Sequence, residues 1–320
     1  MLLQKLCMRT LHTTRQLCVS GAGVGAGMQK SALAALRKKT GYTFANCKKA
    51  LELHNNDVQQ AEKWLHEQAQ SLGWSKATKV ADRVTTQGLV GVLVSGNRGA
   101  MVELNCETDF VARNDTFKRF VDHVSRIVLH YTDLTEFDGD LWKLGFDSDA
   151  LKNLATPQGG NLGDHLALLI GAMGENASIR RALCFKVNND LRLAGYAHPA
   201  PTNVGTIQNI TQVGKYGAIV AFRSKQEFDD VEFQKSICQQ IVGMKPLKVG
   251  EYEKDKPAEN KDDETCLIHQ EYLLDADKTM GEMLQEQQIQ VVDYHRFECG
   301  EKTQRELAEI MQNQQRQSSN

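Results

Sequence analysis

The residues best suited to nucleophilic or metal chemistry in this 320-residue chain are eight cysteines and nine histidines. No two cysteines form a C-x-x-C pair, and none lies at zinc-ligand spacing with a histidine. A thiol enzyme would need one reactive cysteine with a base nearby. Cys106 is the only cysteine inside a distinctive motif, and its plainer interpretation is a small buried residue.

The motifs that mark many enzymes are absent from the sequence. There is no G-x-x-x-x-G-K-[ST] loop for a nucleotide, no H-E-x-x-H and no G-x-S-x-G. The alternating glycines of residues 21–27 do not complete G-x-G-x-x-G, because residue 26 is alanine. We therefore expect a binding protein rather than an enzyme, with no cofactor and no metal ligands.

Charge is unevenly distributed along the chain. The 38 basic and 40 acidic residues give a net charge of −2, which argues against electrostatic binding of nucleic acid, and no apolar run approaches membrane-spanning length. The first acidic residue is Glu52. The first 20 residues carry arginine, serine and threonine with leucines spaced for one helix face, which predicts a mitochondrial transit peptide over about residues 1–28. The alternative is a disordered basic tail. If the segment is a transit peptide, we expect the Gly/Ala-rich residues 21–27 to be the flexible junction near its cleavage site.

A small helical domain is predicted for residues 29–82, including its linker. Ser31, Thr43 and Asp57 can each cap a helix, and Gly41 can end the first one. The residues expected to face inward on the three helices are Leu33, Leu36, Phe44, Cys47, Ala50, Leu51, Val58, Ala61, Trp64 and Leu65. Residues 71–82 are predicted to form a linker or connecting helix.

The rest of the chain predicts an α+β core with antiparallel sheets, built from two related halves, residues 83–195 and 196–300. Residues 88–105 contain two β-rich runs around a Ser-Gly-Asn-Arg turn, and residues 203–223 match them at paired Val-Gly and Gly-Ala positions. A helical pattern follows each copy. The charged residues 250–264 predict a solvated loop, and residues 301–320 a C-terminal tail.

The string NCETDFVARN at residues 105–114 links the first hairpin to its helix. Read locally, Thr108, Asp109 or Asn114 could cap that helix and Phe110 could be a core residue. The string resembles the signature of the translation elongation factor Ts family. Other segments that resemble this family are Leu33 to Leu51, Gly174-Glu175-Asn176 with Arg180-Arg181, Tyr196-x-His198, Val204-Gly205, and Gln270 with Asp275 to Met280.

This resemblance covers about residues 31–301 and, with the transit peptide, indicates a mitochondrial member. It implies a guanine-nucleotide exchange factor for elongation factor Tu, whose nucleotide and Mg²⁺ belong to that partner. It also implies a ubiquitin-associated-like fold for the three helices. In the family the segment matching Thr108, Asp109, Phe110 and Val111 is linked to dislodging the Mg²⁺. Weaker candidates for partner contact are His198, Arg113 and Asn114.

One departure from many bacterial members concerns self-association. Those members carry a long helical insertion in the second half of the core, and here Lys245-Pro246 leads quickly into the charged loop. We therefore expect a monomer that forms a one-to-one complex with its partner in the mitochondrial matrix. A ubiquitin-associated-type adaptor, working through the N-terminal helices alone, remains the alternative function.

Overall fold

The structure is a computed structural model that describes residues 24–40, 42, 44–199, 209–224 and 230–302. The chain divides into two compact units, Met1–Leu65 and His66–Asn320. Most of the predicted transit peptide (residues 1–28) and of the predicted tail (residues 301–320) lies outside the described residues, so both stay predictions.

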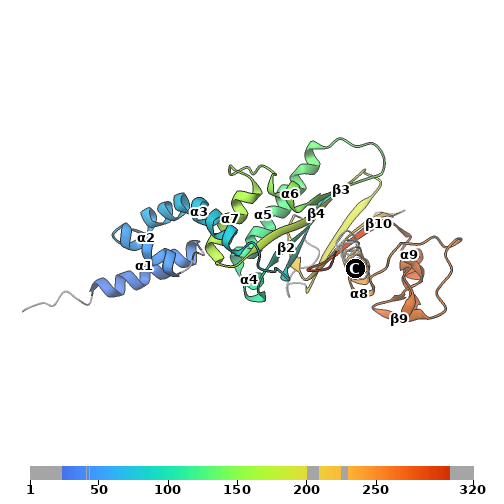
Figure 1. Ribbon diagram of the computed structural model, residues 1–320. Coiled ribbons are helices and arrows are strands. Elements are labelled where there is room, and N and C mark those ends of the chain that lie inside the picture. The colour runs from blue at the N-terminus through green and yellow to red at the C-terminus, as the bar shows by residue number, and fades with distance from the viewer. Residues whose placement is uncertain (1–23, 41, 43, 200–208, 225–229, 303–320) are drawn as a thin grey trace, which may run out of the picture. The chain divides into compact units, whose positions relative to one another are not determined.

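The N-terminal unit contains α1 (Val24–Thr40), α2 (Phe44–Leu53) and the start of α3 (Val58–Val80) (Figure 1). Asp57 caps α3 as predicted, since its carboxylate accepts the backbone N–H of Gln59 at 2.8 Å and of Gln60 at 3.0 Å. The buried residues at the centre of this unit are Leu36, Tyr42, Cys47, Ala50, Leu51, Ala61 and Leu65.

Three expectations for these helices are wrong. The first helix begins at Val24, so Ser31 lies inside it and residues 24–27 are helical rather than a flexible junction. No proline interrupts this stretch, and a helical glycine costs only about 1 kcal/mol. Phe44 is 55% exposed instead of buried, because it opens α2 on the outer side of the unit. Gly41 and Thr43 lie outside the described residues.

The predicted linker at residues 71–82 is mainly the C-terminal part of α3, which packs against α7 (Leu162–Met173). A Cβ atom on Gly73 would lie 2.4 Å from the backbone oxygen of Ala167, so only glycine permits this approach. The indole N–H of Trp74 donates a hydrogen bond to Asp164 at 3.1 Å. This part of α3 therefore belongs structurally to the C-terminal unit.

The first sheet of the C-terminal unit is antiparallel and has the strand order β3-β4-β2-β1-β6. The predicted hairpin is confirmed, since β1 and β2 pair from Gly88 with Asn105 to Ser95 with Arg98. The strands are β1 (Gln87–Ser95), β2 (Arg98–Cys106), β3 (Leu141–Asp147), β4 (Ala177–Val187) and β6 (Gln212–Gly214).

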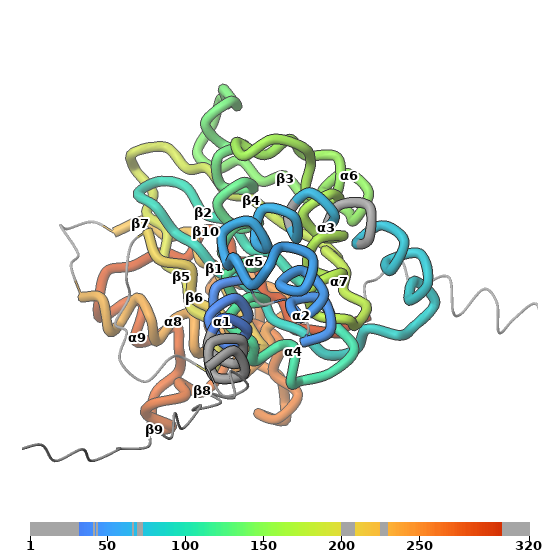
Figure 2. The backbone as a smooth tube through the Cα atoms, turned by 90° about the vertical axis from the view of Figure 1, so that its left-hand side faces the viewer, coloured from blue at the N-terminus to red at the C-terminus, as the bar shows by residue number. Residues whose placement is uncertain are grey.

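Helices cover one face of this sheet. The chain passes from β2 through the short α4 (Asp109–Arg113) into α5 (Asp115–Tyr131), as Figure 2 traces. The helical pattern predicted after the first hairpin is confirmed as α5. Its residues Phe117 and Val121 are fully buried in the core that the sheet shares with α7. The remaining short elements here are η1 (Thr132–Leu134) and α6 (Ser148–Lys152).

The second sheet has the order β10-β7-β5 and carries its own helices. Its elements are β5 (Arg192–His198), β7 (Tyr216–Ser224), α8 (Val231–Met244), α9 (Met280–Glu286) and β10 (Ile289–Glu298). The helical pattern predicted after the second copy is confirmed as α8, in which Phe233 and Ile237 are buried. A small pair, β8 (Glu271–Tyr272) and β9 (Asp275–Thr279), precedes α9.

The two sheets pack face to face over a shared apolar core. Glycines permit the contact: a Cβ on Gly217 would lie 2.6 Å from a methyl group of Val92, and a Cβ on Gly99 would lie 3.2 Å from Ile219. Gly99 and Gly217 are the matched glycines of the predicted repeat. The repeated residue therefore marks the face where the sheets meet.

The second copy of the hairpin differs from the prediction. Its second strand is β7, but β7 pairs with β5 and β10 rather than with a strand just before it. The run expected as its first strand, residues 204–207, lies outside the described residues, and β6 joins the first sheet beside β1. Sequence similarity identified β7 but could not identify its partner, because strand pairing is a tertiary property.

The charged loop at residues 250–264 is largely exposed, as predicted, and contains only the short η2 (Lys261–Asp263). The chain then continues through η3 (Leu267–His269). Within the described residues no helix is both long and apolar enough to cross a membrane.

Candidate functional site

Two capped helices shape the 108–114 segment directly after β2. The Thr108 hydroxyl oxygen accepts the backbone N–H of Val111 at 3.4 Å and begins α4. Asn114 accepts the backbone N–H of Thr116 at 2.7 Å and begins α5. The extended backbone of Asn114 separates the two helices, so α4 is a single short turn of five residues.

Buried side chains hold this turn against the first sheet. Cys106, Val111 and Ala112 are all buried in the core between the sheet and its helices. The Cys106 thiol donates to the backbone oxygen of Thr108 at 3.1 Å, and burial raises the pKa of Cys106 to about 12. Cys106 is therefore an anchor of the turn, as its plainer interpretation predicted.

Phe110 is the residue of this segment that the fold leaves outside. Its side chain is 79% exposed, which makes it the most exposed aromatic residue in the described parts of the chain. The interpretation of Phe110 as a core residue is wrong, because Val111 and Ala112 occupy the inward side of α4. An exposed aromatic side chain on a fixed turn is suited to contact another molecule.

The charged residues of α4 pair with each other. Arg113 donates to Asp109 at 2.9 Å across one helical turn, and both side chains are well exposed. This places the Asp109 carboxylate on the outer surface near Phe110, where water screens the ion pair.

A loop far away in sequence supports the same turn. Gly174 ends α7 with a φ of 84°, a left-handed conformation that favours glycine, and turns the chain towards α4. The Thr108 hydroxyl donates to the Glu175 carboxylate, with oxygen distances of 2.9 and 3.2 Å. The backbone N–H of Asn176 donates to Glu107 at 2.5 Å. The structure thus joins the 174–176 loop to the 107–108 residues.

Sequence reasoning did not identify Glu175 as part of this site. Its only signal was that Gly174-Glu175-Asn176 forms one of the segments resembling the family. Residue spacing could not reveal the contact, because 67 residues separate Thr108 from Glu175.

His198 has different neighbours from the 108–114 segment. It ends β5 in the second sheet, where its ring nitrogen Nδ1 lies 2.9 Å from the Tyr196 hydroxyl. The rings of Tyr196 and Tyr216 flank it, with centroids at 6.1 and 6.3 Å. The side chain is exposed on a well-held strand end, so a contact role for His198 stays a prediction.

A buried carboxylate ties the two sheets together. Glu103 on β2 is fully buried and pairs with Arg180 at 3.0 Å and Arg181 at 2.6 Å, both on β4. It also accepts the backbone N–H of Gly300, just after β10, at 2.7 Å. The paired arginines that resemble the family pattern therefore neutralise a charge at the junction of the two sheets.

Among the described residues, the cysteines and potential metal ligands form neither a reactive-thiol site nor a metal site. Burial raises the pKa of all six cysteines that the structure describes, so none has the lowered pKa of a reactive thiol. In the described part of the chain, no group of three or more His, Cys, Asp or Glu side chains is placed to hold a metal ion.

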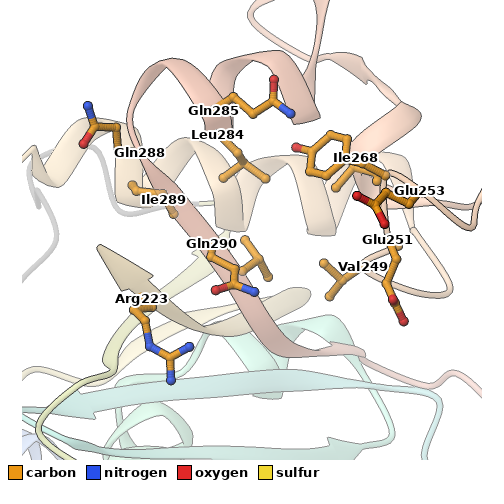
Figure 3. A pocket seen from close by; sticks show the side chains of 13 residues that line it. Arg223, Val249, Glu251, Glu253, Ile268, Leu284, Gln285, Gln288, Ile289 and Gln290 are labelled. Carbon is orange, nitrogen blue, oxygen red and sulfur yellow. The ribbon is translucent and has the colours of Figure 1, made fainter. Parts of the chain in front are cut away.

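A cavity of about 590 Å³ lies in the second half of the core (Figure 3). Glutamines line it together with aliphatic residues of α9 and β10, and the charged loop contributes Glu251, Tyr252 and Glu253. Arg223 at its edge is paired with Asp140 at 3.0 Å. None of its lining residues belongs to the 108–114 segment, so the two features are separate.

Taken together, the fold and this segment suit a protein that binds a partner through a fixed, exposed turn. Comparison with known proteins identifies the family. Residues 8–75 match the family model described as elongation factor Ts, mitochondrial, N-terminal, and residues 107–263 match the model described as elongation factor TS.

Relatives match over nearly the whole chain. The proteins named elongation factor Ts, mitochondrial, from Drosophila melanogaster, Aedes aegypti and Homo sapiens are 77%, 54% and 41% identical to it. The alignments cover 100%, 90% and 85% of this chain and 100%, 95% and 83% of the relatives. The chain belongs to the elongation factor Ts family.

Proposed function

We propose that this chain is a guanine-nucleotide exchange factor for mitochondrial elongation factor Tu. It binds the GDP-bound GTPase and promotes release of GDP, so that GTP can rebind during translation elongation. Membership of the elongation factor Ts family supports this, as does the mitochondrial designation of its relatives. The family match over residues 107–263 favours a role for the core rather than an adaptor built from the N-terminal helices alone.

The observation that carries the mechanism is the exposure of Phe110 on a turn that buried and helix-capping residues hold in place. Cys106, Val111 and Ala112 are buried, and Thr108 and Asn114 cap helices. Phe110 is left free to enter a partner as a wedge, with Asp109 beside it.

Magnesium makes the partner sensitive to such a wedge. Mg²⁺ requires nearly ideal octahedral geometry and offsets the charge of the phosphates. A small shift of the partner helix that supports the metal would spoil this geometry, and GDP would lose much of its electrostatic hold. Coupling between two sites is reciprocal. Bound GDP must therefore weaken the chain's affinity for the partner by the same factor by which the chain weakens the partner's affinity for GDP. The exchange factor supplies binding energy and no chemical step, so it is not an enzyme.

We further propose that the protein works in the mitochondrial matrix as a monomer that forms a one-to-one complex. No nucleic acid or membrane takes part. The described chain from residue 245 to residue 266 contains only the three-residue η2, which leaves no room for a helical dimerisation insertion. His198, Arg113 and Asn114 are proposed as additional contacts.

The test is release of labelled GDP from purified mitochondrial elongation factor Tu, with and without this protein. The wild-type chain should accelerate release, and Phe110→Ala should slow the accelerated rate about 10- to 100-fold, as expected when a buried aromatic anchor worth about 2 kcal/mol is lost. Leu134→Ala is the control, since Leu134 is apolar, 73% exposed and beyond the far end of α5. Equal rates with and without the wild-type protein would refute the exchange function.

A further inference from the structure

The geometry points to Glu175 as a positioning residue for exchange: its carboxylate holds the turn that presents Phe110, without contacting the partner's nucleotide site itself. This inference rests on the proposed wedge role of Phe110. The helix α4 has only five residues. So short a helix is not stable by itself, and its orientation must come from tertiary contacts.

The first contact fixes the beginning of the helix. A threonine hydroxyl has one proton and two lone pairs. The proton of Thr108 goes to the Glu175 carboxylate at 2.9 Å, which leaves a lone pair to accept the N–H of Val111. A hydrogen bond to a charged acceptor is stronger than a neutral one. Glu175 thereby sets the rotation of the hydroxyl that caps α4.

The second set of contacts fixes Glu175. Its neighbour Asn176 donates its backbone N–H to Glu107, and its side-chain amide donates to the backbone oxygen of Arg83 at 2.8 Å. The Arg83 guanidinium in turn lies 3.4 Å from the Glu107 carboxylate. Three segments, after α3, after β2 and after α7, thus meet in one hydrogen-bonded network around the base of α4.

The position of Phe110 follows from this network. Phe110 lies two residues after Thr108, and its own side chain makes little contact with the fold because it is 79% exposed. The orientation of the Phe110 side chain is therefore set by the backbone of the first turn of α4. When the Glu175 carboxylate is removed, α4 can fray or turn, and the ring then enters the partner in the wrong direction. A misplacement of about 1 Å is enough to cost a large factor in rate.

The experiment separates maximal exchange rate from affinity. GDP release from mitochondrial elongation factor Tu is measured over a range of concentrations of Glu175→Ala, Glu175→Gln, Phe110→Ala and the Glu175→Ala/Phe110→Ala pair. Glu175→Ala should lower the maximal rate about tenfold and change the half-saturating concentration less than about threefold. Glu175→Gln should lose less, since its amide oxygen can still accept the Thr108 proton. Asp149→Ala, which removes an exposed carboxylate on α6, controls for the loss of charge.

The double variant gives the decisive result. If Glu175 acts through Phe110, the pair should exchange no more slowly than Phe110→Ala alone. Two results would overturn the positioning role and leave the wedge role of Phe110 intact. One is a double variant whose rate loss equals the product of the two single losses, and the other is a maximal rate of Glu175→Ala equal to that of wild type. A normal rate for Phe110→Ala would instead refute the wedge and, with it, this inference. If Glu175→Ala does not fold, Thr108→Val removes the same hydrogen bond from the other side, together with the α4 cap, and should give the same non-additive pattern.

Discussion

Replacing Phe110 with alanine should leave the stability of the protein almost unchanged. A phenylalanine buries roughly 200 Å² when fully enclosed, and the 79% exposure of Phe110 leaves about a fifth of this area in contact with the fold. At about 25 cal/mol per Å², the loss is about 1 kcal/mol. Phe117, seven residues later and fully buried under the first sheet, is the matched comparison. Phe117→Ala should cost about 3–5 kcal/mol.

The assay is urea unfolding of both variants and the wild type, with GDP release measured on the same preparations below the unfolding transition. Phe110→Ala should unfold within about 1 kcal/mol of wild type and exchange slowly. Phe117→Ala should unfold early and, while still folded, exchange at a rate closer to that of wild type. A Phe110→Ala variant destabilised by more than about 2 kcal/mol would refute the assignment of Phe110 as an exposed residue without a role in the fold.

Three further predictions concern stability. Burial, with the positive charges of Lys143 and Arg181, lowers the pKa of His295 from 6.5 to about 4, with Asp293 opposing, so the neutral ring is favoured in the fold. The free energy of unfolding should therefore be highest above pH 6.5 and fall by about 3 kcal/mol as the pH falls towards 4, because the unfolded state binds the proton more readily. In chemical unfolding, the free energy of unfolding of His295→Gln should depend less steeply on pH over this range. Glu103→Ala should destabilise by about 3–5 kcal/mol, since Arg180 and Arg181 would keep their charges without their buried partner, whereas removal of the exposed carboxylate in Asp149→Ala should have little effect in the same measurement. Asn114→Ala should cost about 1 kcal/mol in the unfolding free energy through loss of the α5 cap, and Asn114→Asp should restore most of it; equal stability of both variants would contradict the capping role.

Local patterns predicted the elements that local physics controls. The Ser-Gly-Asn-Arg turn between β1 and β2 was predicted because a hairpin turn needs residues that tolerate its backbone geometry. The apolar face of α5 and the cap at Asp57 were predicted for the same kind of reason, since helical periodicity and capping act over a few residues. The start of the first helix was predicted wrongly. Ser31 can cap a helix, but no proline between Val24 and Ser31 prevents the helix from beginning earlier.

The partner of β7 could not be predicted by the same means. The repeated glycines at Gly99 and Gly217 suggested two equivalent hairpins, yet β7 pairs with β5 across a long connection. Which strand pairs with which depends on how both faces of the sheet are buried and on the cost of closing the intervening chain. Neither can be deduced from the residues of the strand alone. The meaning of the two glycines, close contact between the sheets, became visible only with both sheets in place.

The sequence by itself determined the family of the protein, since the 105–114 string resembles the signature of elongation factor Ts and the family match agrees with it. Only the tertiary structure decided how that string is divided between fold and surface. Val111 turns inward and Phe110 outward, and Glu175 reaches Thr108 from 67 residues away. Burial and long-range hydrogen bonds depend on the whole chain being folded, because each is a relation between segments rather than a property of one residue.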